Sequence, residues 1–430
     1  MKDKDIIKWL FQAQSLASPS ATASALHSNP TLKNQHLLPS PPESRKRHQS
    51  ITDELNPTSK RQMTEEYIIE VDVDETPRAS SSRKRQEYLP APTESQSEQS
   101  QASGRSSPQN KLLAIETLPK GVEIRSLSPI NPDLPPALSQ LLREFVRCTH
   151  GIGFISNDLQ AEIKEQSKQD PIFDVFEDTM FASQLGPTPS FNDVTLITKE
   201  AQECQDDMQS EAGWNMIVHY PLLHKAIYGQ RDYKQKQLVG FTPCTTAKII
   251  LEYLRLNLQA KMVDFCIYIE PEMDDIAFNA ILSLRRVLPC YVINHTDFLP
   301  LRRSPIAISI ETKRQGGAQP ATAELQLGTW HAAQWNLLED LIARSGGSFD
   351  GLSFLPAVIV EGHDWSFAAT TREGQKTVLW LEKKFGSTSD VVGVYKTVWG
   401  LQRLAKWASE VYWPWFRKNA LGVSVEQDDA

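Results

Sequence analysis

The chain of 430 residues is long enough for two or three domains and carries a formal net charge of -8. No stretch approaches the roughly 18 to 20 consecutive apolar residues of a membrane-spanning helix, so the sequence excludes an integral membrane protein. The five cysteines are odd in number and form no C-x-x-C pair, which favours reduced thiols over a disulfide scaffold or a zinc ribbon.

Composition divides the chain into two parts. Residues 1–136 hold 15 of the 27 prolines and are rich in Ser, Gln and Thr, whereas nine of the ten tryptophans follow residue 213. Such a segment buries too little apolar surface to offset the entropy of folding, so 1–136 is predicted to be a disordered tail. The tail balances 17 basic against 17 acidic residues, so the whole net charge lies in residues 137–430. That acidic part is a poor general binder of nucleic acid, and phosphate contacts must come from a local patch, a metal or the tail.

The tail contains three basic clusters, Arg45-Lys46-Arg47, Lys60-Arg61 and Arg83-Lys84-Arg85. A spacer of 12 residues separates the first two, as in a bipartite nuclear localisation signal. The clusters are either a signal for the nuclear import machinery or solvated charge. The first interpretation predicts a nuclear protein, the second a cytoplasmic one.

Ordered structure is predicted from Pro136 onward. A helix at Ala137–Arg147, a polar helix at Leu159–Gln169 and a loop-rich connection over 170–208 form a predicted lead-in region, residues 137–208. The main domain is predicted over residues 209–420.

Helices and strands alternate along the predicted main domain. The first predicted helix is Ser210–Tyr228, capped by Ser210 and kinked or broken at Pro221. The others are Thr245–Ala260, Asp274–Val287, Ala321–Arg344 and, as one or two helices, Val391–Lys418. The predicted strands are Met262–Glu270, Cys290–Asn294, Ile306–Arg314, Leu355–Glu361, Trp365–Thr370 and Thr377–Lys383. This order predicts an α/β fold with a mixed central sheet flanked by helices.

Several familiar sites are absent from the sequence, including a phosphate-binding P-loop, a G-x-S-x-G nucleophile elbow and an H-E-x-x-H zinc motif. The aromatic residues of the last predicted helix follow the helical spacing of its apolar residues, which favours core packing over stacking on bases. The basic residues considered first for phosphate contacts are Arg314, Arg372, Lys376, Lys383 and Lys384.

The strand Ile306–Arg314 carries two charged residues on one face. Side chains alternate along a strand, so Glu311 and Lys313 project from the same surface, opposite Ile308 and Ile310. Asp264 has the same relation to the apolar residues of Met262–Glu270. If the two strands are close, two carboxylates and an ammonium meet on one face. Carboxylates hold a hard cation such as Mg²⁺, and the ammonium orients or deprotonates a hydrolytic water.

Two helices direct further polar groups at the sheet. Glu211 precedes Trp214 and Val218 on the stripe expected to face the protein, where an acidic residue is costly unless it is paired or binds a metal. An alternative is that Glu211 complements the helix dipole. Gln326 occupies a similar stripe with Trp330.

These parts follow one another as a helix with Glu211, a strand with Asp264, a strand with Glu311 and Lys313, and a helix with Gln326. This order resembles the PD-(D/E)XK nuclease superfamily, whose restriction-endonuclease-like core runs αβββαβ. Five segments beside the Ser/Pro-rich tail look like the fungal PD-(D/E)XK nuclease-like domain proteins: Ser210–Asn215, Val263–Pro271, Ile293–Phe298, Ile308–Arg314 and Leu325–Trp335. The chain departs from the pattern because no proline precedes Asp264 and 46 residues separate Asp264 from Glu311.

The resemblance implies roles for these residues. Asp264 and Glu311 would bind Mg²⁺, or Mn²⁺ in its place, with the Thr312 carbonyl and Glu211 as further ligands. Lys313 would be the catalytic lysine, and Glu211 and Gln326 the accompanying polar residues of the site.

Two functions stay open at this point. The first is a metal-dependent nuclease that hydrolyses phosphodiester bonds in nucleic acid, with DNA the expected substrate. The second is a catalytically inactive nuclease-fold scaffold that binds nucleic acid or protein, which the acidic domain and the long insertion favour. The relative placement of Glu211, Asp264, Glu311 and Lys313 distinguishes them.

Overall fold

The computed structural model describes residues 107–155, 162–163, 165–166, 185–229, 237–254, 262–316 and 320–423. All of these residues belong to one unit, Glu66–Ala430. The three basic clusters and the rest of the predicted tail up to residue 106 lie outside the described residues, as does most of the helix predicted at Leu159–Gln169.

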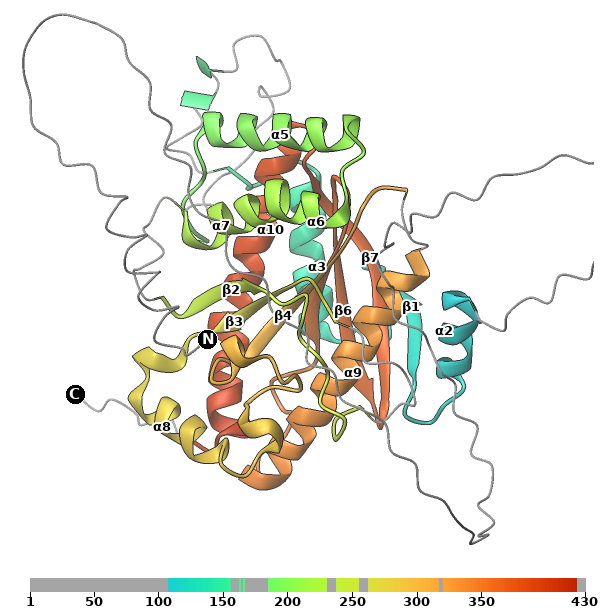
Figure 1. The fold of residues 1–430 in the computed structure, drawn as a ribbon, viewed down its shortest axis with the longest axis vertical. Helices are drawn as coiled ribbons and strands as arrows, with labels where there is room; N and C mark the ends of the chain where they lie inside the picture. The colour runs from blue at the N-terminus through green and yellow to red at the C-terminus, as the bar shows by residue number, and fades with distance from the viewer. Residues whose placement is uncertain are drawn as a thin grey trace, which may run out of the picture. The chain divides into compact units, whose positions relative to one another are not determined.

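A seven-stranded mixed sheet forms the centre of this unit (Figure 1), with the strand order β1-β7-β6-β5-β4-β3-β2. β1 pairs in parallel with β7, and β4 pairs in parallel with β5, while the other neighbours are antiparallel. The strands are β1 (Val122–Ser126), β2 (Val239–Pro243), β3 (Phe265–Ile269), β4 (Ile306–Lys313), β5 (Leu355–Glu361), β6 (Asp364–Glu373) and β7 (Lys376–Ser387).

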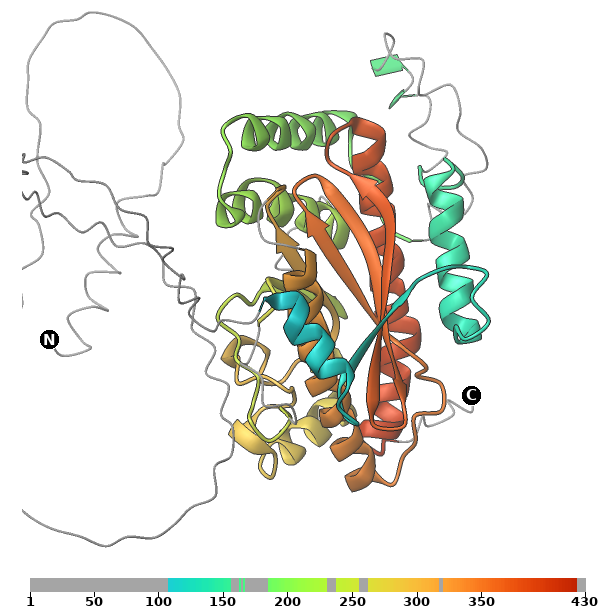
Figure 2. The ribbon, with the colours of Figure 1, turned by 90° about the vertical axis from the view of Figure 1, so that its right-hand side faces the viewer.

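Helices cover both faces of the sheet, as Figure 2 shows. On one face α9 crosses the strands and α2 packs on α9, whereas on the other α10 and α3 pack on β7, and α5 and α7 pack on α10. The helices are α2 (Pro108–Glu116), α3 (Pro136–Thr149), α5 (Phe191–Asp206), α6 (Glu211–Trp214), α7 (Tyr220–Tyr228), α8 (Asp275–Leu284), α9 (Pro320–Ser345), α10 (Val391–Trp407) and α11 (Trp413–Trp415). The predicted α/β class with a mixed sheet between helices is confirmed. None of the described helices is long and apolar enough to cross a membrane.

β4 lies near the centre of the sheet and is buried along its whole length. Its Ile308 and Ile310 side chains are buried and lie two residues apart, on one face. The pairing with β3 shifts register between Ile308 and Ile306. On the other face Trp330 of α9 donates to Ser309 Oγ at 3.0 Å. The central strand is therefore covered on both sides, and its two charged residues lie in protein rather than on a solvated face.

The helix predicted at Ser210–Tyr228 is present in three parts. Ser210 caps α6, because its Oγ accepts from the Gly213 amide at 3.1 Å. A π-helical turn, η3 (Asn215–His219), follows, and α7 then begins around Pro221. The break predicted at Pro221 therefore takes the form of a wider helical turn just before it.

Order begins earlier in the chain than Pro136. α2 and β1 both precede that residue, and β1 completes the sheet by pairing with β7 over Val122–Ser126. The sequence interpretation of residues 107–136 as tail is therefore wrong. The loop-rich connection predicted over 170–208 is wrong for its last part, because α5 is a capped helix with a buried apolar stripe.

Two predicted elements are wrong for local reasons. Residues 245–254 of the predicted helix Thr245–Ala260 form turns and an isolated bridge, and residues 255–260 lie outside the described residues. The predicted strand Cys290–Asn294 is a 3-10 turn and a loop, because the backbone of Cys290 and Tyr291 is left-handed, with φ of 53° and 57°.

The aromatic residues at the end of the chain pack in the core, as predicted. Their side chains are buried against the sheet and against one another. They are Trp399, Trp407, Tyr412, Trp413 and Trp415. These rings are not available to stack on bases.

Candidate active site

Asp264 lies one residue before β3, beside the end of β4. The pairing of the two strands places Phe265 opposite Ile310, and the Asp264 amide donates to the Ile310 carbonyl at 3.1 Å. The buried Asp264 carboxylate accepts from the Thr312 amide at 2.9 Å. Glu311 is the next residue after Ile310, so the sheet brings the two carboxylates to neighbouring positions.

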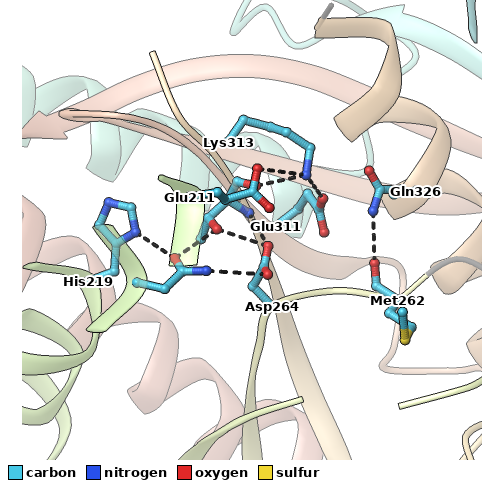
Figure 3. A network of polar contacts seen from close by, with 9 residues as sticks. Glu211, His219, Met262, Asp264, Glu311, Lys313 and Gln326 are labelled. Carbon is cyan, nitrogen blue, oxygen red and sulfur yellow. Dashed lines mark hydrogen bonds and ion pairs between the residues drawn. The ribbon is translucent and has the colours of Figure 1, made fainter. Parts of the chain in front are cut away.

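Lys313 connects three of the groups that the sequence assigned to a metal. Its Nζ lies 2.5 Å from Glu311 Oε1, 2.9 Å from the Thr312 carbonyl oxygen and 3.5 Å from Glu211 Oε2. Figure 3 shows the ammonium between the Glu211 and Glu311 carboxylates. The structure thus brings Glu211, Asp264, Glu311 and Lys313 together, although they come from three separate segments of the chain.

Burial sets the charge properties of this group. It raises the pKa of Glu311 well above its usual range, Asp264 raises it further, and Lys313 opposes both. Burial likewise raises the pKa of Asp264, against the Lys313 charge and hydrogen bonds from Thr312. Burial favours the neutral form of Lys313, but Glu311, Glu211 and Asp264 outweigh it and raise its pKa, so Lys313 is an ammonium at neutral pH.

Glu211 is the first residue of α6 and the most exposed member of the group. Its side chain is 38% exposed, compared with 1% for Glu311 and 11% for Lys313. Burial raises its pKa, and the Lys313 charge partly offsets that effect. Its carboxylate therefore lies at the mouth of the site, while those of Asp264 and Glu311 form the floor.

The Thr312 hydroxyl and the Asn215 amide contact Asp264, and His219 contacts Asn215; sequence reasoning selected none of these three side-chain groups. Thr312 Oγ1 lies 2.9 Å from Asp264 Oδ2 and 2.8 Å from Asn215 Oδ1, and Asn215 Nδ2 donates to Asp264 Oδ1 at 3.4 Å. The buried His219 ring lies 2.9 Å from Asn215 Oδ1 and 3.1 Å from the Gly362 carbonyl. The π-helical turn places Asn215 and His219 on one side, and its spacing is not evident in the sequence.

Gln326 borders the site, but within the part of the chain that the structure describes its side chain donates to a backbone carbonyl and not to a charged group. Its Nε2 donates to the Met262 carbonyl at 3.3 Å, and Figure 3 shows it beside Met262, away from Asp264. The hydrogen bond joins α9 to the segment that leads into β3. Gln326 is therefore placed to hold that segment in position.

A cavity of about 710 Å³ opens in front of these residues. Its polar wall consists of Glu211, Asn215, Asp264, Glu311 and Lys313, with Gln326 at one side. The remainder is mainly apolar or aromatic: Ala212, Met216, Tyr220, Pro243, Thr245, Met262, Val263 and Phe265. Concave sites of this size, with a few polar groups in an apolar wall, are typical of ligand-binding sites.

The residues fit a divalent cation that keeps several waters. Glu311 Oε2 is buried and has no hydrogen-bond partner among the described residues, so it is available to a ligand. Within the described residues, no group of three or more His, Cys, Asp or Glu side chains is arranged to hold a metal. Mg²⁺ commonly needs only one or two carboxylates besides water and substrate oxygens, which Asp264 and Glu311 can supply with the Thr312 carbonyl.

Comparison with known proteins agrees with this geometry. Residues 162–413 match the family model of the PD-(D/E)XK nuclease superfamily, and the chain belongs to that superfamily. Neither the curated proteins nor the solved structures gave a match. The narrower resemblance to fungal members stays a prediction.

Proposed function

We propose that the protein is a metal-dependent nuclease that hydrolyses phosphodiester bonds in nucleic acid, with DNA the expected substrate. Membership of the nuclease superfamily supports the general activity. The observation that carries the proposal is the joint placement of Asp264, Glu311 and Lys313 on the wall of one cavity.

Each residue has a distinct task in this proposal. Asp264 and Glu311, with the Thr312 carbonyl and Glu211, would hold Mg²⁺ or Mn²⁺. When bound, the cation supplies Lewis acidity toward a phosphoryl oxygen and lowers the pKa of a water. Lys313 keeps its proton at neutral pH, so it orients the attacking water and opposes negative charge on the phosphate. Thr312 and Asn215 hold the Asp264 carboxylate in one orientation.

The decisive experiment combines cleavage and metal binding on the full chain. We expect Mg²⁺ or Mn²⁺ to support cleavage of labelled DNA or RNA, and Lys313→Ala to reduce the rate by about 10² to 10⁴. Calorimetry should detect divalent-metal binding that Glu311→Gln weakens. The matched control is Lys406→Ala, because Lys406 also forms an ion pair, with Glu410, and does not line the cavity.

The nuclease proposal is wrong if purified protein neither binds these metals nor cleaves any nucleic acid. Cleavage that survives Lys313→Ala unchanged would point to a contaminating enzyme and would also contradict it.

A second candidate is the inactive scaffold, and the contacts of Lys313 favour it. The ammonium already donates to Glu311 Oε1 and to the Thr312 carbonyl, so a group of the chain itself occupies positions that a cation would use. A scaffold would bind nucleic acid or a protein partner equally well with and without divalent metal, and Lys313→Ala would leave that binding in place.

The protein is further proposed to enter the nucleus. The support is the spacing of Arg45-Lys46-Arg47 and Lys60-Arg61, which lie outside the described residues. A fluorescent fusion should lose nuclear accumulation when both clusters are replaced by alanine, and an unchanged distribution would contradict this location.

A further inference from the structure

A row of aromatic side chains leads away from the cavity along α7. Tyr220 lines the cavity wall, and His224 and Tyr228 follow it at intervals of four residues. Residues four apart lie on the same side of a helix, so the three rings share one face. Their centroids are 6.4 Å apart between Tyr220 and His224, and 5.2 Å apart between His224 and Tyr228. We name these three residues the aromatic row.

The aromatic row is accessible to solvent and packs against a buried aromatic ring. Tyr220 is 42% exposed, and His224 and Tyr228 are half-buried. Beneath them Phe241 of β2 is buried, with its ring 5.1 Å from Tyr220 and 5.4 Å from Tyr228. The Tyr228 hydroxyl accepts from the Phe241 amide at 3.2 Å. The rings therefore lose little freedom when a flat ligand packs on them.

The end of the aromatic row at the cavity continues as an apolar wall. Met216, four residues before Tyr220, is 77% exposed and lines the cavity. Met262 and Phe265 also line the cavity. An exposed aromatic and apolar surface that begins at catalytic carboxylates is suited to planar groups attached to the reacting phosphate.

The charges of the site argue against a duplex. Among the described residues that line the cavity, Lys313 is the only cation, against Glu211, Asp264 and Glu311. Along α7, Lys225 is paired with Asp193 at 2.9 Å. Duplex DNA carries one negative charge per roughly 1.7 Å and needs many cations for tight binding. Of the basic residues first considered for phosphates, Arg372, Lys376 and Lys384 also form ion pairs, with Glu339, Glu123 and Asp364.

We propose that the aromatic row is a binding track for single-stranded nucleic acid, on which successive unpaired bases stack while the strand enters the cavity. The inference rests on the proposed function and adds strandedness to it. Four helical residues advance about 6 Å, whereas stacked bases in a duplex strand are about 3.4 Å apart. The spacing of the row therefore fits bases that are separated from one another, each against its own side chain.

Stacking on side chains also explains how an acidic domain can bind nucleic acid. Every base has a flat face, so stacking on aromatic side chains contributes about 1 to 3 kcal/mol per base with little regard to sequence. Burial and the nearby Lys225 charge lower the pKa of His224, so its ring is neutral at pH 7 and stacks as an uncharged aromatic. Because Lys313 is the only cation among the described residues that line the cavity, binding should depend less on salt than it does in proteins with a positively charged groove.

The test measures binding with Ca²⁺ in place of Mg²⁺, so that cleavage does not interfere. Fluorescence anisotropy compares a labelled oligothymidylate of about 12 nucleotides with the same strand annealed to oligodeoxyadenylate. We expect the single strand to bind more tightly than the duplex. Tyr220→Ala should weaken single-strand binding by about five- to a hundredfold, and Tyr220→Phe should restore it.

The matched control is Tyr291→Ala. Tyr291 is 69% exposed on the segment between α8 and β4 and does not line the cavity, so its loss should leave binding unchanged. Circular dichroism establishes that each variant is folded. Tighter binding of the duplex, equal binding by Tyr220→Ala and wild type, or no binding of any nucleic acid would each overturn the proposal.

The outcomes for the track and for the nuclease are distinguishable. If single-strand binding depends on Tyr220 but no cleavage depends on Lys313, the binding track is supported and the nuclease proposal is wrong. If cleavage depends on Lys313 but binding does not depend on Tyr220, the nuclease proposal is supported and the binding track is wrong.

Discussion

Two buried polar clusters lie on the sheet, and they differ in charge. The site cluster consists of Asp264, Glu311 and Lys313, which are ionisable and border a cavity. The α9 cluster lies between α9, β4 and β6 and consists of neutral groups. In it Thr370 Oγ1 accepts from Trp335 Nε1 at 3.0 Å and lies 2.8 Å from His331 Nδ1, while Gln334 donates to the Ile306 carbonyl at 2.8 Å.

The comparison separates polar groups that stabilise a fold from those that form a site. Burial lowers the pKa of His331 to about 3 and keeps it neutral, so the α9 cluster avoids the cost of a buried ion. In the site cluster burial raises the pKa of Glu311 and Asp264, but Lys313 stays an ammonium. Glu311 Oε2 has no hydrogen-bond partner among the described residues. A buried charge beside a cavity is therefore the stronger indication of chemistry.

The largest expected effect comes from breaking the ion pair of the site cluster. Lys313→Met leaves Glu311 buried without its partner, which should lower the free energy of unfolding by about 3 to 5 kcal/mol. The double variant with Glu311→Gln should recover most of this loss. Urea unfolding measures both, with Lys376→Met as the control at a more exposed pair, where we expect less than about 1 kcal/mol. A fully stable Lys313→Met would refute this account.

The same substitution at one threonine of each cluster allows a direct comparison of the two clusters. Thr312→Val and Thr370→Val each remove one buried hydroxyl from a strand. Thr370→Val leaves Trp335 Nε1 unpaired and should cost about 1 to 3 kcal/mol of stability without changing cleavage. Thr312→Val should cost less, because the Thr312 amide still donates to Asp264, but should slow cleavage about tenfold. The reverse pattern would show that the comparison is wrong.

The neutrality of His331 predicts a dependence of stability on pH. Its folded pKa of about 3 lies below the unfolded value near 6.5, so only the unfolded chain takes up a proton between those values. Stability should therefore fall as the pH decreases, by about 1 kcal/mol between pH 7 and 5.5 for this group. The difference between wild type and His331→Gln in urea unfolding isolates it, and parallel pH curves would contradict the prediction.

The smallest expected effect concerns Gln326, which the sequence placed among the catalytic residues. Because its amide donates to the Met262 carbonyl and not to a charged group of the described site, Gln326→Ala should change the cleavage rate by less than about threefold and cost about 1 kcal/mol of stability. A kinetic assay at saturating substrate gives the rate. If Gln326→Ala lowered the cleavage rate as much as Lys313→Ala does, Gln326 would be a catalytic residue after all.

Strands with a regular apolar pattern could be predicted from the sequence, and those that depend on tertiary packing could not. β4 was evident from its alternating isoleucines. β2 was not, because Gly240 and Pro243 are poor strand formers. In the fold Gly240 lies against the Tyr268 ring, where a Cβ would come within 2.7 Å of Tyr268 Cζ, so glycine is required there for packing.

The charged residues of the candidate site could be predicted from the sequence. Acidic and basic residues in apolar segments attract notice because burial is costly for them, and this identified Glu211, Asp264, Glu311 and Lys313. Asn215 and His219 carry no such signal. They become neighbours through a π-helical turn, and no local sequence preference predicts such a turn at this position.

β1 has a consequence for how the protein can be handled. It forms the edge of the sheet beside β7, pairing Val122–Ser126 with Thr377–Leu381. A fragment cut at residue 137 would remove this strand and expose the unpaired amides and carbonyls of β7. Open, apolar edges invite pairing with other chains, so such a fragment would be prone to aggregate even though every candidate catalytic residue is retained.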